Sequence, residues 1–185
     1  MLFIMIEFQK PQLTDKPWVD ALLRQADYRG CDYSFTNLFA WSDAYDQRIA
    51  RVDDFLVARL TASLGPSYLY PAGSGDILPV LQALEEDARE RGCPLRLACL
   101  TPEQVEDLEA RFPGRFQFQA HRDSFDYLYD IDRLADLGGK KLHAKRNHIN
   151  RFLENNPSWT YEDITPESLP QCLEMDREWY RRSAV

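Results

Sequence analysis

The sequence lacks any apolar run of the length that a membrane span or a secretory signal requires. Glu7 ends the hydrophobic start of the chain after six residues, and no basic segment precedes it. A membrane span needs about 20 consecutive apolar residues, and the apolar part of a signal peptide needs about 7 to 15. We therefore expect a soluble, cytoplasmic chain without a membrane span. The short apolar start instead predicts a first strand from Ile4 to Phe8.

Residues that commonly hold metal ions are few and widely separated. No two of the four cysteines have the C-x-x-C spacing of a zinc ribbon or a thioredoxin-like redox site. Two of the three histidines, His143 and His148, lie five positions apart, about 140° around a helix, so they do not face one metal ion. The sequence therefore predicts no metal site, and it identifies no catalytic residue. The cysteines, which we expect to be small buried residues, are Cys31, Cys93, Cys99 and Cys172.

The composition is globular, but the charge is unevenly distributed. Of the 185 residues, 44% are hydrophobic and 12% aromatic, and the chain has no low-complexity tract or repeat of fixed period. This length allows one domain, or one domain and part of a second. The net charge of −8 argues against general affinity for nucleic acid, and we expect no binding of DNA. Residues 140–151, however, contain five Lys and Arg and no acid, which leaves 17 bases against 30 acids elsewhere.

Apolar periodicity and turn signals predict an α+β chain. Asp76 and Thr101 are expected N-caps, the latter in a capping box with Gln104, and Asp53–Asp54 is an expected hairpin turn. Helices are predicted at 14–30, 34–41, 77–91, from 101 onward, at 139–155 and at 174–182, after a linker at 166–170. Strands are predicted at 48–52, 55–61, 68–70, 95–100, 116–120, 125–130 and 159–164.

Three segments carry a resemblance to a known family. They are residues 68–76 (YLYPAGSGD), residues 126–130 (DYLYD) with Leu134, and residues 137–152 (LGGKKLHAKRNHINRF). Together they resemble an uncharacterised family related to the C-terminal domain of phosphatidylglycerol lysyltransferase. The order of the elements is similar to that of the GNAT acyltransferase fold, in which a mixed, mostly antiparallel sheet is flanked by helices.

This resemblance implies two GNAT-like domains in tandem. Residues 1–165 would form the first domain, and residues 166–185 would begin a second, truncated one. The lysyltransferase relatives move an aminoacyl group from charged tRNA to a lipid headgroup. The resemblance therefore implies an acyl- or aminoacyltransferase-like protein whose donor is acyl-CoA or an aminoacyl-tRNA. It does not imply that the chain is active without a complete second domain.

The sequence Tyr-x-x-Gly-x-Gly that begins at Tyr70 is similar to the loop that binds the pyrophosphate of CoA in single-domain GNAT enzymes. Gly73, Ser74 and Gly75 are therefore the candidate cofactor-binding residues. Glycine lets the backbone approach a phosphate closely, and the helix behind the loop offers free N–H groups. Two departures favour a plain strand-to-helix turn instead. Tyr70 replaces the usual polar residue, and Asp76 places a carboxylate where the anion would lie.

The basic segment predicts a binding surface for an anion. On a helix over 139–155, Lys141, Lys145 and His148 fall within about 60° of one another and form one row. Such a row suits phosphate groups, although a solvated cationic face has the same pattern. The candidate ligands are a tRNA and a small anion such as a nucleotide or a lipid headgroup.

Arg146 completes the set of candidate anion-binding residues but points in another direction. It lies about 20° from the apolar face of the helix, which includes Leu142 and Leu153. A guanidinium in that position needs an acidic partner, an anionic ligand or a path to water. The strand predicted just before this helix makes Asp126 and Asp130 the nearest candidate partners.

Two further hypotheses stand beside group transfer. The chain is a non-catalytic module that binds an anionic ligand through residues 140–151, or it is a structural half-domain that needs a partner chain. Met175, Trp179 and Tyr180 lie at helical spacing near the C-terminus. We expect them either to dock onto another copy of the chain, because an exposed apolar helix face commonly marks an interaction site, or to be poorly ordered.

Overall fold

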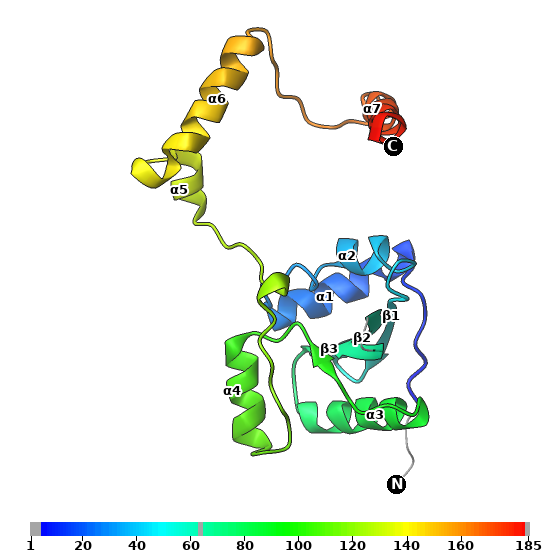
Figure 1. The fold of residues 1–185 in the computed structure, drawn as a ribbon. Coiled ribbons are helices and arrows are strands. Elements are labelled where there is room, and N and C mark those ends of the chain that lie inside the picture. The colour runs from blue at the N-terminus through cyan, green and yellow to red at the C-terminus, as the bar shows by residue number, and fades with distance from the viewer. Residues whose placement is uncertain (1–4, 63–64, 184–185) are drawn as a thin grey trace. The chain divides into compact units, whose positions relative to one another are not determined.

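The structure, a computed structural model, describes residues 5–62 and 65–183 (Figure 1). The chain divides into two compact units, Met1–Tyr127 and Leu128–Val185. The domain boundary predicted at residue 165 concerns GNAT-like domains and stays a prediction.

The first unit is built on a five-stranded sheet. Its strands are β1 (Arg48–Val52), β2 (Phe55–Ala62), β3 (Gly65–Leu69), β4 (Ala72–Gly73) and β5 (Leu97–Ala98). The strand order is β1-β2-β3-β5, and β4 pairs with β2. Strands β3 and β5 are parallel, and the other strand pairs are antiparallel. This is the mixed, mostly antiparallel sheet that the sequence predicts, and the fold is of the expected GNAT-like α+β class.

The β1–β2 hairpin follows from its turn residues. Asp53 adopts a φ of 50°, a left-handed conformation that Asp tolerates better than most residues. Val52 then pairs with Phe55 across a two-residue connection, the commonest loop length in hairpins. The predicted turn at Asp53–Asp54 and its two flanking strands are confirmed.

Helices cover both faces of this sheet. Helices α1 (Lys16–Ala26) and α3 (Ile77–Glu90) lie on opposite sides of it, as Figure 1 shows. The other helices of the unit are α2 (Phe35–Ala40), α4 (Pro102–Arg111) and two short 3-10 helices, η1 (Leu13–Asp15) and η2 (Arg122–Ser124). Leu84, in the middle of α3, is completely buried. Burial of one such side chain stabilises the fold by about 1.5–3 kcal/mol.

The predicted N-caps of α3 and α4 are confirmed. The Asp76 carboxylate accepts a hydrogen bond from the Leu78 N–H at 3.0 Å. Thr101 and Gln104 form a reciprocal capping box at the start of α4. These caps satisfy backbone N–H groups that have no acceptor within their own helix, which explains why both helices begin at these residues.

A buried charged network joins the sheet to α3. The Tyr68 hydroxyl donates to Asp87 at 2.5 Å, and Arg91 Nε donates to the same carboxylate at 2.8 Å. The guanidinium of Arg59 lies 3.9 Å from Asp87 and 5.0 Å from the centre of the Phe8 ring. Burial acts to raise the pKa of Asp87, but hydrogen bonds from Arg91 and Tyr68 outweigh it, so this pKa is lowered.

The second unit consists of helices that bury little apolar surface. These are α5 (Ile131–Asp136), α6 (His143–Asn155), with a short 3-10 helix, η3 (Lys140–Leu142), directly before it, and α7 (Leu169–Ser183). Leu137, 8% exposed, is the one buried residue among the described residues of this unit. Nowhere in the described parts of the chain is a helix both long enough and apolar enough to cross a membrane.

Several predicted strands are wrong. The described residues at 5–8 form no strand, and Ile4 lies outside the described residues. Gln9 instead makes a single antiparallel bridge with Ile49. The segments predicted as strands that contain none are 116–120, 125–130 and 159–164. A short alternating apolar pattern gives a strand only where a neighbouring strand supplies hydrogen bonds, and no described strand does so for these segments.

Candidate functional site

The glycine loop is a tight connection between β4 and α3. Gly73 pairs with Phe55 across the sheet, and a Cβ on it would lie 2.0 Å from the Asp54 carbonyl oxygen. Gly75 adopts a φ of +118°, which residues with a side chain rarely take. The backbone therefore requires both glycines, Gly73 for close approach and Gly75 for its conformation.

The polar residues of this loop are engaged within the protein. The Ser74 hydroxyl accepts a hydrogen bond from the Gln25 side chain. The Asp76 carboxylate accepts a hydrogen bond from the Leu78 N–H, which is one of the N–H groups that a bound phosphate would use. This geometry suits the strand-to-helix turn, and binding of a cofactor by the loop stays a prediction.

A tyrosine cluster lies at the carboxyl ends of the parallel strands. Tyr70 directly follows β3, and Cys99 directly follows β5. Tyr28 packs against Tyr33 and Tyr70, with ring centres 5.0 and 6.0 Å apart. The Tyr33 hydroxyl donates to the Cys99 carbonyl oxygen at 3.3 Å. Ligands of open α/β sheets bind beyond the carboxyl ends of parallel strands, so the tyrosine cluster (Tyr28, Tyr33 and Tyr70) is a second candidate site.

The tyrosine cluster was not predicted because Tyr28 and Tyr33, in the loop between α1 and α2, lie far along the chain from Tyr70. The sequence predicts strands near Tyr70 and Cys99 but not that these strands pair. Cys99 has a φ of 59°, a left-handed conformation that costs a non-glycine residue about 1–3 kcal/mol and that clusters at functional sites. No local pattern signals that conformation, and Tyr70 at the end of a predicted strand is the one available hint.

Two cysteine thiols border this cluster, and their surroundings raise the pKa of both. Although parts of Cys31 and Cys99 are exposed, desolvation and then a hydrogen bond with Asp126 raise the pKa of Cys31 to about 11. Desolvation and then Asp32 raise the pKa of Cys99. Because the thiolate is the nucleophile and the metal ligand, neither thiol favours covalent catalysis. The expectation that the cysteines are buried is wrong, because Cys31 and Cys99 are exposed and Cys93 and Cys172 are only half-buried. Among the described residues, no group of three His, Cys, Asp or Glu side chains is arranged to hold a metal ion.

Helix α6 and η3 present basic side chains that have no carboxylate partner in the part of the chain that the structure describes. The cation row (Lys141, Lys145 and His148) is exposed. Within the described residues, no Lys or Arg of 140–151 lies within 4.0 Å of a carboxylate oxygen. By contrast, α3, α4 and α7 each pair arginines with acids of the same helix. The row is therefore available to an external anion, and its role in binding stays a prediction.

Arg146 is half-buried, and its partners are backbone carbonyls. Its guanidinium donates to the carbonyl oxygens of Leu137 and Gly139, the latter at 3.0 Å. The sequence predicts a side chain near the apolar face of this helix, and the half-buried position agrees with that orientation. Arg146 thus closes the turn that precedes its own helix.

The carboxylates expected beside Arg146 have other partners. Asp126 accepts the Cys31 N–H at 3.0 Å, and this hydrogen bond lowers the pKa of Asp126. Asp130 accepts the Arg133 N–H at 2.9 Å and caps α5. Within the second unit, the expected pairing with Asp130 is wrong, because that carboxylate caps α5 instead. Asp126 belongs to the first unit, and its pairing with Arg146 stays a prediction.

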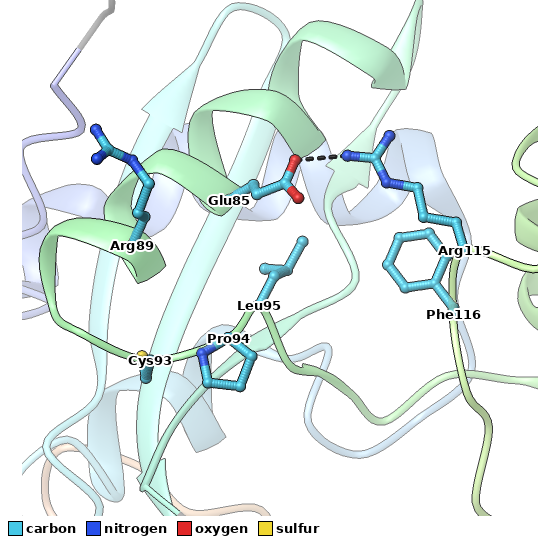
Figure 2. A pocket seen from close by; sticks show the side chains of 7 residues that line it. All are labelled: Glu85, Arg89, Cys93, Pro94, Leu95, Arg115 and Phe116. Atoms are coloured by element: carbon cyan, nitrogen blue, oxygen red, sulfur yellow. Dashed lines mark hydrogen bonds and ion pairs between the residues drawn. The ribbon is translucent and has the colours of Figure 1, made fainter.

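An open depression of about 380 Å³ in the first unit was not expected from the sequence. At the edge of this depression, Arg115 Nη2 lies 2.5 Å from a carboxylate oxygen of Glu85. Figure 2 shows this ion pair as a dashed line. Arg89 is likewise paired with Glu86. Because both arginines that line the depression are already paired with acids, we assign the depression no anionic ligand. The residues that line it are Glu85, Arg89, Cys93, Pro94, Leu95, Arg115 and Phe116.

Comparison with known proteins identifies the family. No curated protein matches the chain. A solved structure, described as a conserved protein of unknown function from Bacteroides thetaiotaomicron VPI-5482, is 39% identical, covers 97% of this chain and has a TM-score of 0.86. The chain spans 61% of the length of that relative. The family described as phosphatidylglycerol lysyltransferase, C-terminal, matches residues 23–184. This match extends over most of the chain and includes all three segments that carry the resemblance, so the chain belongs to the phosphatidylglycerol lysyltransferase C-terminal family.

Proposed function

We propose that the chain acts in acyl or aminoacyl transfer and that it contacts the phosphates of the donor through the cation row. Membership of the lysyltransferase C-terminal family supports a transferase. The observation that carries the proposal is that Lys141, Lys145 and His148 are exposed and have no carboxylate partner among the described residues. Acyl-CoA and aminoacyl-tRNA both present phosphates that such a row suits.

The acidic character of the whole chain is compatible with this role. The net charge is −8, but charges more than about 8 Å apart are largely screened at physiological salt. A phosphate beside α6 therefore interacts mainly with the cations of residues 140–151, where no acid interrupts the sequence. For a phosphate beside α6, the charge of residues 140–151 therefore has a larger effect on binding than the net charge of the chain.

Transfer is tested directly with the full-length protein. The protein is incubated with tRNA that carries a labelled amino acid, or with labelled acyl-CoA, and with vesicles that contain phosphatidylglycerol. Mass spectrometry then detects labelled products. We expect product with one donor and a strong loss of product in the double variant Lys141→Ala/Lys145→Ala. The matched control is Arg177→Ala/Arg181→Ala, which removes two cations that are already paired on α7. Absence of product with both donors would refute transfer.

A non-catalytic binding module is the second candidate, and one observation favours it. His148, the imidazole of the cation row, makes no hydrogen bond to another described residue, so nothing orients it as a general base. This hypothesis predicts binding of tRNA, a nucleotide or a lipid headgroup without turnover. Binding should weaken as salt rises. Lys145→Ala should make the slope of log affinity against log salt concentration shallower by about 1, as expected for the loss of one phosphate contact. An affinity that stays constant between low and moderate salt would rule it out.

A further inference from the structure

The connection between α5 and α6 has a strained backbone. Leu137 ends α5 with a φ of 50°, and Gly139 follows with a φ of +83°. The left-handed conformation is unfavourable for a residue with a side chain, so Leu137 needs support from its surroundings. The 3-10 helix η3 begins directly after this turn and carries Lys141 toward α6.

Arg146 supplies that support from the first turn of α6. Its Nη1 atom donates to the carbonyl oxygens of both Leu137 and Gly139. Carbonyls at the end of a helix have no donor within that helix, and a charged donor makes stronger hydrogen bonds than a neutral one. Among the described residues of the second unit, Leu137 is also the one that is buried. We call these two hydrogen bonds the Arg146 clasp.

We propose that Arg146 is a positioning residue, which fixes the turn at Leu137–Gly139 and thereby places Lys141 in line with Lys145. Lys141 lies in η3, between the turn and α6, so its position depends on the turn. Lys145 lies within α6 and is positioned by the helix itself. The consequence for anion binding rests on the proposed function, whereas the clasp does not.

Amide hydrogen exchange tests the clasp without any ligand. Arg146→Met removes the donor, and Gly139→Ala strains the turn without a change in charge. Gly138→Ala is the matched control, because a Cβ there would meet nothing within 4 Å. We expect exchange across residues 137–146 to accelerate about tenfold in the first two variants and to stay unchanged in the control. Unchanged exchange in the first unit shows that the variants are folded. Wild-type exchange in Arg146→Met would overturn the proposal.

Binding of uncharged tRNA tests the positioning role. Arg146→Met and Gly139→Ala should each weaken binding about fivefold, and Lys141→Ala should have a smaller effect in the Arg146→Met background than in the wild type. Loss of stability alone would not produce that coupling. If Arg146→Met weakens binding and Gly139→Ala does not, Arg146 contacts the tRNA directly and the positioning role is overturned. If the wild type binds no tRNA, an aminoacyl-tRNA donor is ruled out for the cation row, and the exchange experiment still decides the clasp.

Discussion

The two units of the chain contain similar apolar residues but bury them very differently. The first unit completely buries Val19 of α1, Ile49 of β1 and Leu84 of α3. In the second unit, Phe152 of α6 is 49% exposed and Trp179 of α7 is 58% exposed. Burial of such a side chain contributes about 1.5–3 kcal/mol, so only the first unit has a substantial apolar core among its described residues. Amphipathic periodicity therefore predicts which face of a helix is apolar, but not whether this chain covers that face.

The largest expected effect is a loss of stability when a carboxylate that binds two arginines is removed, and this loss should differ between the two units. Asp87→Ala removes the carboxylate that Arg91 and Tyr68 bind and that lies beside the buried Arg59. Removing one partner of a buried ion pair costs about 3–5 kcal/mol. Glu178→Ala is the matched change in the second unit, because Glu178 also binds two arginines, but at the surface. Exposed pairs contribute about 0–1 kcal/mol. Equal losses in denaturant unfolding would contradict the comparison.

Truncation of one leucine in each unit tests the difference in packing. Leu84→Ala should lower the free energy of unfolding by about 2–5 kcal/mol, because it leaves a cavity in a fully buried site. Leu153→Ala, at a residue 41% exposed on α6, should cost less than about 0.5 kcal/mol. Chemical denaturation followed by circular dichroism measures both. A large loss at Leu153 would show that the apolar face of α6 is packed in solution.

A glycine in each unit gives a smaller contrast. Gly73→Ala forces a Cβ against the Asp54 carbonyl oxygen and should cost about 1–3 kcal/mol. Gly138→Ala meets no atom within 4 Å and should be neutral or stabilise slightly. Melting temperatures measured under one set of conditions compare them. An unchanged melting temperature in Gly73→Ala would mean that β4 does not pair with β2 in solution.

Features that depend on neighbouring residues could be predicted from the sequence. The hairpin turn at Asp53–Asp54, the Asp76 cap and the capping box of Thr101 with Gln104 each involve residues a few positions apart. The half-buried position of Arg146 follows from the same local geometry, since 100° per residue fixes its direction on the helix.

Features that depend on distant segments could not be predicted. The tyrosine cluster requires parallel pairing of β3 with β5, which no local pattern of the sequence encodes. The partners of Arg146 are backbone carbonyls, which every residue carries, so side-chain chemistry could not identify them. Met175, Trp179 and Tyr180 are exposed as expected for a self-association surface, and self-association itself stays a prediction.

The smallest expected effect concerns the pH dependence of the buried network. Burial acts to raise the pKa of Asp87, but the hydrogen bonds from Arg91 and Tyr68 outweigh it, and the pKa lies below its ordinary value of 3.8. A carboxyl with a lowered pKa binds fewer protons in the folded state than in the unfolded state. Its stabilising contribution is therefore complete above the unfolded value and is lost as pH falls through the folded value. Asp87→Asn should be less stable than the wild type at neutral pH, and the difference should narrow as pH falls below about 4. Asp43→Asn is the control, because its ion pair with Lys10 lies at the surface and solvent screens it. Unfolding free energies measured at a series of pH values test this, and a difference for Asp87→Asn that stays constant into the acid range would show that the fold does not favour its charged form.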